Sequence, residues 1–213
     1  MFYNSFDKFN KEINIKSLKN VNKNKYKYIN IPKTLKSIEL YKDIFKQMIC
    51  KPQKLIENNK DYYVALDKYT NTIYICYKEL LMLDIDLWKN DNKINLEKLN
   101  ESLELFDVYK SKNGYHIFCI SKKYDYNNVN TIQFMIDNNS DFYYNFYTYL
   151  RGFCVRLNRK QNEYQELISK RLCPFIYKYV GRYGKGILNK DLEKLVKYHF
   201  LLSIKYNNYD PIL

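Results

Sequence analysis

The segment Leu80–Leu87 most constrains the fold of this chain, because it sets two carboxylates into an otherwise apolar run. Its length and apolar character fit a buried strand. Side chains two residues apart point to the same face of a strand, so Asp84 and Asp86 are expected to lie together. Neighbouring carboxylates repel each other and resist desolvation unless a divalent cation neutralises them. The pattern predicts a metal site, and the exposed end of an ordinary strand is the alternative.

Segments with helical and with strand periodicity surround this run, which predicts a mixed α+β fold. Helices are expected over 35–49 behind a Thr34 cap, from an Asn95 cap to Phe106, and over 129–137, 163–172 and 189–206. Strands are expected over 62–66, 73–77, 80–87, 107–110, 115–121, 142–150 and 153–157, and in a piece ending at Gly181 before a loop over 182–186. The polar segments 67–72 and 112–114 predict two β-hairpins.

The length of 213 residues fits one domain behind a polar lead-in. Residues 1–30 are rich in Lys and Asn, and the pattern fits an ordered lead-in as well as a flexible arm. Residues 31–213 are expected to form a single domain, with a motif-bearing core at 60–165 and a C-terminal helical extension at 162–213.

Hydropathy and cysteine spacing predict a soluble, intracellular protein without membrane contact. No apolar run of about eighteen residues occurs, and the first thirty residues are interrupted by polar side chains, unlike a signal peptide. The cysteines lie far apart without a CxxC pair, which predicts reduced thiols in the core rather than a zinc knuckle or a disulfide framework. They are Cys50, Cys76, Cys119, Cys154 and Cys173.

A formal net charge of +13 favours a polyanionic partner, because clustered cations release counterions from phosphates. The abundance of Lys, Asn, Tyr and Ile is also what an A/T-rich coding sequence produces, which weakens the argument from Lys. Arginine is more specific, since all five arginines fall between Arg151 and Arg182. Its planar fork suits phosphate and carboxylate groups. The nucleic-acid-binding candidates are Arg151, Arg159, Arg182 and Lys185.

Two further segments carry candidate site residues. The turn at Lys112 leads His116 onto an apolar strand, where a hydrogen-bonded core histidine is the alternative. A helix separates this strand from the acidic pair, so the two strands can be neighbours in one sheet. Asp141 is the candidate third acid, with Asp137 as a rival. The only other histidine, His199, lies in a predicted helix and is expected to be structural.

The basic segment 151–160 reads RGFCVRLNRK and follows an aromatic run. Arg156 and Asn158 share a face of the predicted strand, and Lys160 extends that row. An ordinary solvated strand end is the alternative. Three carboxylates, a histidine and a row of cations together suit phosphoryl transfer from a nucleotide.

The segments MLDIDL, NGYH, Ser140-Asp141 and RGFCVRLNRK, in this order, resemble the motifs of the archaeo-eukaryotic primase superfamily, especially the compact primase-polymerases of viruses and plasmids. The resemblance covers residues 60–165. It implies an archaeo-eukaryotic primase-like catalytic core, in which an RRM-like mixed or antiparallel sheet with flanking helices lies beside an αβ unit.

The resemblance also implies roles for single residues. Mg²⁺ or Mn²⁺ would be bound by Asp84, Asp86 and Asp141, and His116 would be catalytic and contact the incoming nucleotide. The other nucleotide-binding candidates are Lys112, Arg156, Asn158 and Lys160, while Arg151 would serve the nucleotide or the template. No Walker A motif accompanies these segments, so a replicative helicase would be a separate partner.

The expected function is that of a DNA primase or primase-polymerase, a nucleotidyltransferase that joins nucleotides on a nucleic-acid template by two-metal phosphoryl transfer. Its partners would be single-stranded template or primer-template DNA and nucleoside triphosphates. Two alternatives remain: a catalytically inactive primase-fold protein that binds nucleic acid, and a metal-dependent nuclease. The composition resembles that of a large DNA virus of eukaryotes, which would place the protein in a viral replication compartment in the host cytoplasm.

Overall fold

Antiparallel pairing builds two separate four-stranded sheets in this computed structural model, and helices flank them. The structure describes residues 34–39, 42, 53–67, 72–86, 94, 96–111, 114–158 and 178–207. All of them belong to the compact unit Lys33–Leu213. The mixed α+β class predicted from the sequence is confirmed, while the predicted division into lead-in, core and extension stays a prediction.

The first sheet has the strand order β1-β2-β3-β7. Its strands are β1 (Gln53–Asn58), β2 (Tyr62–Asp67), β3 (Thr72–Tyr77) and β7 (Phe153–Arg156). The predicted hairpin of β2 and β3 is confirmed, since Tyr62 pairs with Tyr77 and Asp67 with Thr72. The edge strand β1 was not predicted from the sequence.

The second sheet has the strand order β4-β6-β5-β8 and is antiparallel throughout. Its strands are β4 (Met82–Asp86), β5 (Leu105–Lys110), β6 (Gly114–Cys119) and β8 (Lys178–Gly184). The hairpin of β5 and β6 and the acidic strand β4 are confirmed. Arg182 lies within β8, so the prediction of a loop from that residue is wrong. Its pairing opposite Asp107 explains why the strand continues.

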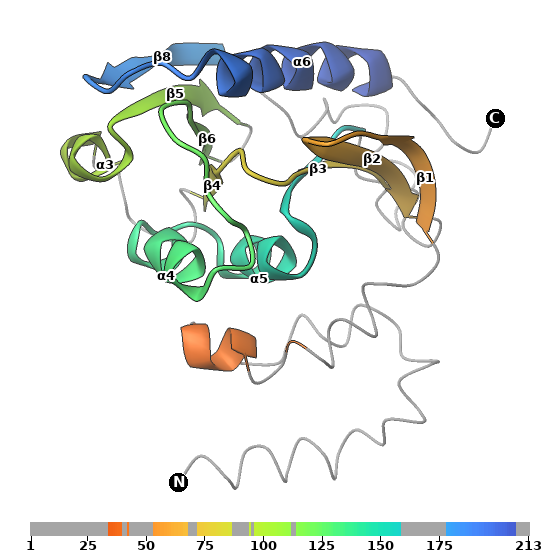
Figure 1. Ribbon diagram of the computed structural model, residues 1–213, viewed down its shortest axis with the longest axis horizontal. Coiled ribbons are helices and arrows are strands. Elements are labelled where there is room, and N and C mark those ends of the chain that lie inside the picture. The colour runs from red at the N-terminus through yellow and green to blue at the C-terminus, as the bar shows by residue number, and fades with distance from the viewer. Residues whose placement is uncertain are drawn as a thin grey trace, which may run out of the picture. The chain divides into compact units, whose positions relative to one another are not determined.

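Four labelled helices complete the fold: α3 (Leu96–Leu103), α4 (Val129–Asp137), α5 (Phe142–Arg151) and α6 (Lys190–Asn207). Figure 1 shows α6 on one side of the second sheet, with α4 and α5 on the other. The bounds of α4 match the prediction. α3 ends earlier than predicted, because Glu104 has a φ of 60° and Phe106 belongs to β5.

The prediction of a strand over 142–150 is wrong, since this segment is the helix α5. Its many aromatic residues favour strands by propensity. The buried positions Phe142, Asn145 and Phe146 instead follow helical spacing, and Asp141 caps the first turn. Gly152, with a φ of 103°, then ends the helix and lets the chain turn into β7.

One predicted helix lies partly, and another wholly, outside the described residues. Residues 35–39 are helical behind Thr34, whose Oγ1 accepts a hydrogen bond from Ser37 N at 3.2 Å. The rest of that predicted helix, apart from residue 42, lies outside the described residues, as do the Asn95 cap and the helix expected over 163–172.

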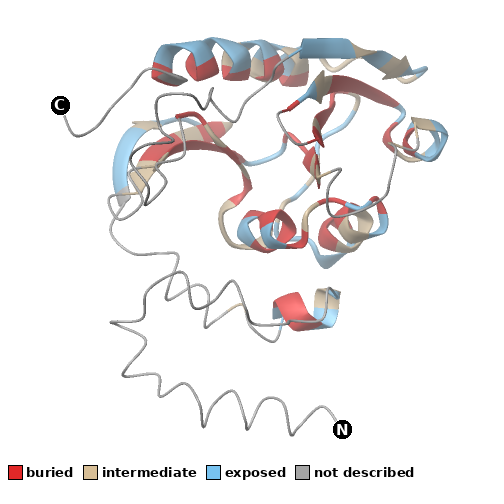
Figure 2. Cartoon of the chain, turned by 180° about the vertical axis from the view of Figure 1, so that it is seen from behind, coloured by how far each residue is buried: buried red, intermediate tan, exposed pale blue. Residues whose placement is uncertain are grey.

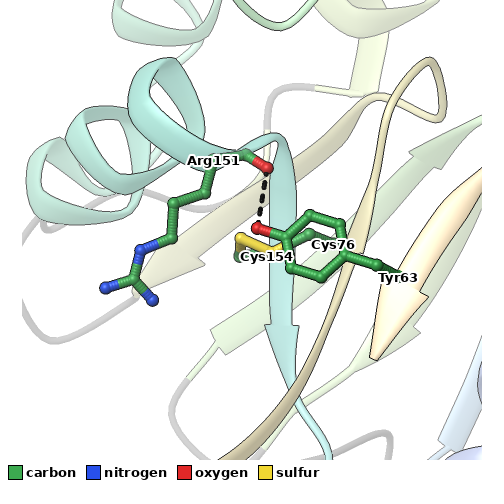
Figure 3. Close-up of a disulfide and its surroundings, with 4 residues drawn as sticks. All are labelled: Tyr63, Cys76, Arg151 and Cys154. Atoms are coloured by element: carbon green, nitrogen blue, oxygen red, sulfur yellow. Dashed lines mark hydrogen bonds between the residues drawn. A yellow bond between two sulfur atoms is a disulfide. The ribbon is translucent and has the colours of Figure 1, made fainter. Parts of the chain in front are cut away.

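A disulfide joins Cys76 of β3 to Cys154 of β7 (Figure 3), so the prediction of reduced cysteines is wrong for this pair. The two residues face each other in the β3–β7 ladder, with their Cα atoms 4.1 Å apart. They are separated by 78 residues in the sequence, so only the sheet pairing brings them together. Cys119 is a buried free thiol, as predicted. Cys50 and Cys173 lie outside the described residues.

Helix α6 packs against both sheets. The ring centroid of His199 lies 6.0 Å from that of Tyr77 in the first sheet and 5.4 Å from that of Phe118 in the second. The Tyr198 hydroxyl donates to Glu57 of β1 at 3.2 Å. Figure 2 shows that α6 is buried along the side facing the strands and exposed on the other. No described helix is both long and apolar enough to cross a membrane.

Gly114 is required for the pairing of β4 with β6. A Cβ atom at this position would lie 1.7 Å from the carbonyl oxygen of Ile85. We expect Gly114→Ala to lower the free energy of unfolding by about 3 kcal/mol, because overpacking against backbone cannot relax. Gly181→Ala is the matched control, since its Cβ would meet only the Tyr183 ring at 3.3 Å. Urea titrations of both variants test this, and equal losses would contradict it.

Candidate active site

Strand β4 holds Asp84 and Asp86, both half-buried, in a segment whose apolar residues are fully buried. Leu83 and Ile85 are buried, whereas the two aspartates alternate with them along the strand. Both carboxylates therefore project from one face, as the sequence predicts. The side chain of Asp84 is 29% exposed, which leaves it accessible to a ligand.

His116 lies directly opposite Asp84 in the β4–β6 ladder. Its Nε2 is 3.6 Å from Asp84 Oδ1, which is longer than a hydrogen bond. Burial lowers the pKa of His116 to about 4, and Arg156 adds to the shift. The carboxylate of Asp84 acts in the opposite direction. His116 is therefore neutral at physiological pH and carries one N–H donor.

The backbone of Asp141 lies next to the backbone of Asp84. Asp141 N donates to the Asp84 carbonyl at 2.7 Å, and Asp84 N donates to Ser140 Oγ at 3.2 Å. The Asp141 carboxylate caps α5, because its Oδ1 accepts from Tyr144 N at 2.9 Å. The rival Asp137 is exposed at the end of α4, where its Oδ1 accepts from Gln133 Nε2.

No three side chains of His, Cys, Asp or Glu within the described ranges are grouped so that they could hold a metal ion. The backbones of Asp84 and Asp141 nevertheless lie side by side in space, because two hydrogen bonds of the Asp84 backbone join it to residues 140 and 141. The shared three-carboxylate cluster stays a prediction.

Arg156 lies at the end of β7, opposite Tyr74 of β3. Its charge contributes to the low pKa of His116, so it lies near that histidine although it belongs to the other sheet. Asn158 is buried, and its Oδ1 accepts from Ile73 N at 2.8 Å, which anchors the strand end. Lys112, Arg159 and Lys160 lie outside the described residues.

Arg151 ends α5 among tyrosine rings. Its guanidinium carbon lies 5.2 Å from the Tyr74 ring centroid and 5.3 Å from that of Tyr147. Its carbonyl accepts from the Tyr63 hydroxyl at 3.2 Å, as Figure 3 shows. These contacts fix Arg151 at the turn into β7, which leads on to Arg156.

Arg182 forms two ion pairs on the face of the second sheet that α6 covers. Its Nε and Nη2 donate to the buried Asp107 at 2.8 and 3.1 Å, and Nη2 also donates to Glu193 of α6 at 2.9 Å. This bidentate arrangement ties β8, β5 and α6 together. Lys185, the neighbouring nucleic-acid-binding candidate, is exposed just after β8.

Sequence reasoning missed the buried polar groups next to these residues. Tyr77 and Tyr144 are buried with their hydroxyls, and both ring nitrogens of His199 are buried as well. Burial lowers the pKa of His199 to about 3, and the nearby His116 adds to this shift. No periodicity in the sequence marks these three positions, because each reads as part of an ordinary apolar face.

The contacts of Arg182 predict a structural role that stability measurements can separate from nucleic-acid binding. Arg182→Ala leaves Asp107 buried without its main cationic partner, so we expect the free energy of unfolding to fall by about 2–3 kcal/mol. Lys185→Ala should change it by less than about 0.5 kcal/mol. An Arg182→Ala protein of unchanged stability and weakened DNA binding would instead assign the residue to the nucleic-acid interface.

The low pKa of His199 predicts a loss of stability in acid. The unfolded chain takes up a proton near the usual pKa of about 6.5, whereas the folded chain does so only near pH 3. Stability is therefore complete above about pH 6.5 and falls as the pH drops. We expect His199→Phe to reduce the loss between about pH 7 and about pH 5 by about 2 kcal/mol in urea titrations. An unchanged pH dependence would show that His199 is protonated in the folded protein.

Comparison with known proteins adds no relative: no family model matches this chain, and neither a curated protein nor a solved structure is significantly similar to it.

Proposed function

We propose that this chain is a metal-dependent nucleotidyltransferase of the primase type, which joins nucleotides on a DNA template. The observation that carries the proposal is the pair Asp84 and His116, whose side chains lie 3.6 Å apart on neighbouring strands. Arg156 of the other sheet is close enough for its charge to lower the pKa of His116. A carboxylate, a neutral N–H donor and a guanidinium are complementary to a divalent cation with a nucleoside triphosphate.

The chain topology supports the proposal at the level of the fold. The order β4-α3-β5-β6-α4, with the strands arranged β4-β6-β5, is that of the β-α-β-β-α part of a ferredoxin-like or RRM-like unit. β8 joins this unit at the outer edge of β5. The first sheet would then be the partner unit that contributes Arg156 across the site.

The residues of β4 fit a hard divalent cation such as Mg²⁺ or Mn²⁺. Asp84 and Asp86 offer carboxylate oxygens from one strand face, and both are half-exposed. Asp141 would join them with the oxygen that does not cap α5. A cation bound there would neutralise charge on the phosphate oxygens.

The side chains around the cation would mainly bind and orient the nucleotide. His116, being neutral, would donate its N–H to a phosphate oxygen, and Arg156 would bind the triphosphate through its fork. In phosphoryl transfer, positioning and charge stabilisation supply most of the rate enhancement. Lys112, Asn158 and Lys160 remain nucleotide-binding candidates, and Arg151, Arg159 and Lys185 remain candidates for the template.

A second function, nucleic-acid binding without catalysis, is favoured by the role of Asp141 as a helix cap. A capping carboxylate has a structural reason to be present even where no metal binds. In that case the basic residues would bind DNA, and the acidic pair would be a remnant.

Primer extension tests the proposal. We expect the purified chain to extend a labelled primer on a DNA template with Mg²⁺ or Mn²⁺, and Asp84→Asn and Asp86→Asn to lower the rate at least about a hundredfold. Asp191→Asn is the matched control, because this aspartate is highly exposed on α6. The free energy of unfolding of all three variants should lie within about 1 kcal/mol of the wild-type value.

The same assay separates the alternatives. DNA binding without extension would favour the inactive protein, and shortening of the labelled strand would identify a nuclease. Full activity of both aspartate variants would contradict the proposed site.

A further inference from the structure

A group of buried polar atoms beside the candidate site has no hydrogen-bond partner among the described residues. It includes both ring nitrogens of His199, the hydroxyls of Tyr77 and Tyr144, and Nδ1 of His116. All four residues are more than nine-tenths buried. Buried polar groups are nearly always hydrogen-bonded, so several of them in one place require a common explanation.

These side chains are neighbours across the two sheets and α6. The His199 ring packs on Tyr77 of β3 and on Phe118 of β6. Phe118 lies two residues after His116, on the same face of β6. The electrostatic effects of His116 on His199 and of Tyr144 on Tyr77 also indicate that these pairs lie close together.

The chemistry of a neutral imidazole assigns a direction to the hydrogen bonds of His116. One ring nitrogen carries the proton and the other accepts. Nε2 faces the Asp84 carboxylate, which can only accept, so Nε2 is the nitrogen that carries the proton. Nδ1 is then an acceptor that is buried and needs a donor from the interior. Neutral His199 has an N–H to offer, and the Tyr77 hydroxyl is a second donor.

We propose that His199 is a positioning residue for His116. Its N–H donates toward His116 Nδ1 through a buried water shared with the Tyr77 hydroxyl, and this keeps the proton of His116 on Nε2. Buried waters typically occupy such sites, where they join polar groups that would otherwise lack partners. The tautomer matters under the proposed function, because only the Nε2–H form can donate to a nucleotide beside Asp84.

The tautomer of His116 can be measured without nucleotide or metal, which makes the test independent of catalysis. The full chain has two histidines, so histidine-selective ¹⁵N labelling gives few imidazole signals, and in His199→Phe only His116 remains. We expect the wild-type His116 signals to be those of the Nε2–H tautomer. His199→Phe keeps the ring contacts and removes both nitrogens, and it should change the tautomer ratio about fivefold, the factor that one net hydrogen bond supplies.

Ser203→Ala is the matched control. Ser203 lies one turn after His199 on α6, and its buried hydroxyl also lacks a partner among the described residues. This change should leave the His116 signals as they are. His199→Gln keeps an N–H and should therefore retain the wild-type tautomer of His116. Tyr77→Phe removes a single hydroxyl and should shift the His116 tautomer ratio in the same direction as His199→Phe. It therefore provides the test if His199→Phe fails to fold.

Unchanged His116 signals in the folded His199→Phe or Tyr77→Phe protein would overturn the proposal. If the chain extends primers, His199→Phe should also slow extension about tenfold, as the loss of a supporting hydrogen bond does at other sites, and Ser203→Ala should not. A wild-type chain that extends no primer would defeat the proposed function, but it would leave the tautomer result and its interpretation unchanged.

Discussion

The burial of one helix against two sheets is the interaction on which the rest of the structure depends. α6 contacts Tyr77 in the first sheet and Phe118 in the second through the single ring of His199. Neither sheet alone would bury its inner face, and an apolar face left in water costs about 25 cal/mol per Å². Because β7 and β4 belong to different sheets, the distance between Arg156 and Asp84 is set by this packing. The site is therefore a consequence of the inter-sheet core.

A second constraint fixes the acidic end of the site. β4 is joined to β6 by its ladder and to the start of α5 by the Asp141 N and Ser140 Oγ hydrogen bonds. The backbone of Asp84 is thus held on both sides, by the β6 ladder and by the segment before α5, without help from its own side chain. Gly114 allows this close approach, since any larger residue would collide with Ile85. Under the proposed function, a carboxylate held in position in advance would meet the condition for effective electrostatic stabilisation.

Local patterns in the sequence were enough to predict the two hairpins, β4 and α4, because alternation and capping are properties of short segments. Local patterns failed for segments whose structure is determined by tertiary contacts. The aromatic run became α5 because Asp141 caps it and Phe142 and Phe146 are buried together. The Cys76–Cys154 disulfide depends on the β3–β7 pairing. The pairing of Asp84 with His116 was within reach of the sequence, whereas the buried surroundings of His199 were not, since they combine residues from three distant elements.

The cap formed by Asp141 bears on whether the predicted acidic cluster would need a metal. A helix N-terminus carries a partial positive charge, which stabilises nearby carboxylates by about 0.3–1 kcal/mol. α5 begins beside Asp84, so its N-terminus would offset part of any repulsion between the Asp84 and Asp141 carboxylates without a cation. The same argument does not extend to Asp86, which lies two residues further along β4 and faces Gly114 rather than a helix. Under the proposed function, a divalent cation would therefore have the most charge left to neutralise at the pair Asp84 and Asp86, more than at Asp141.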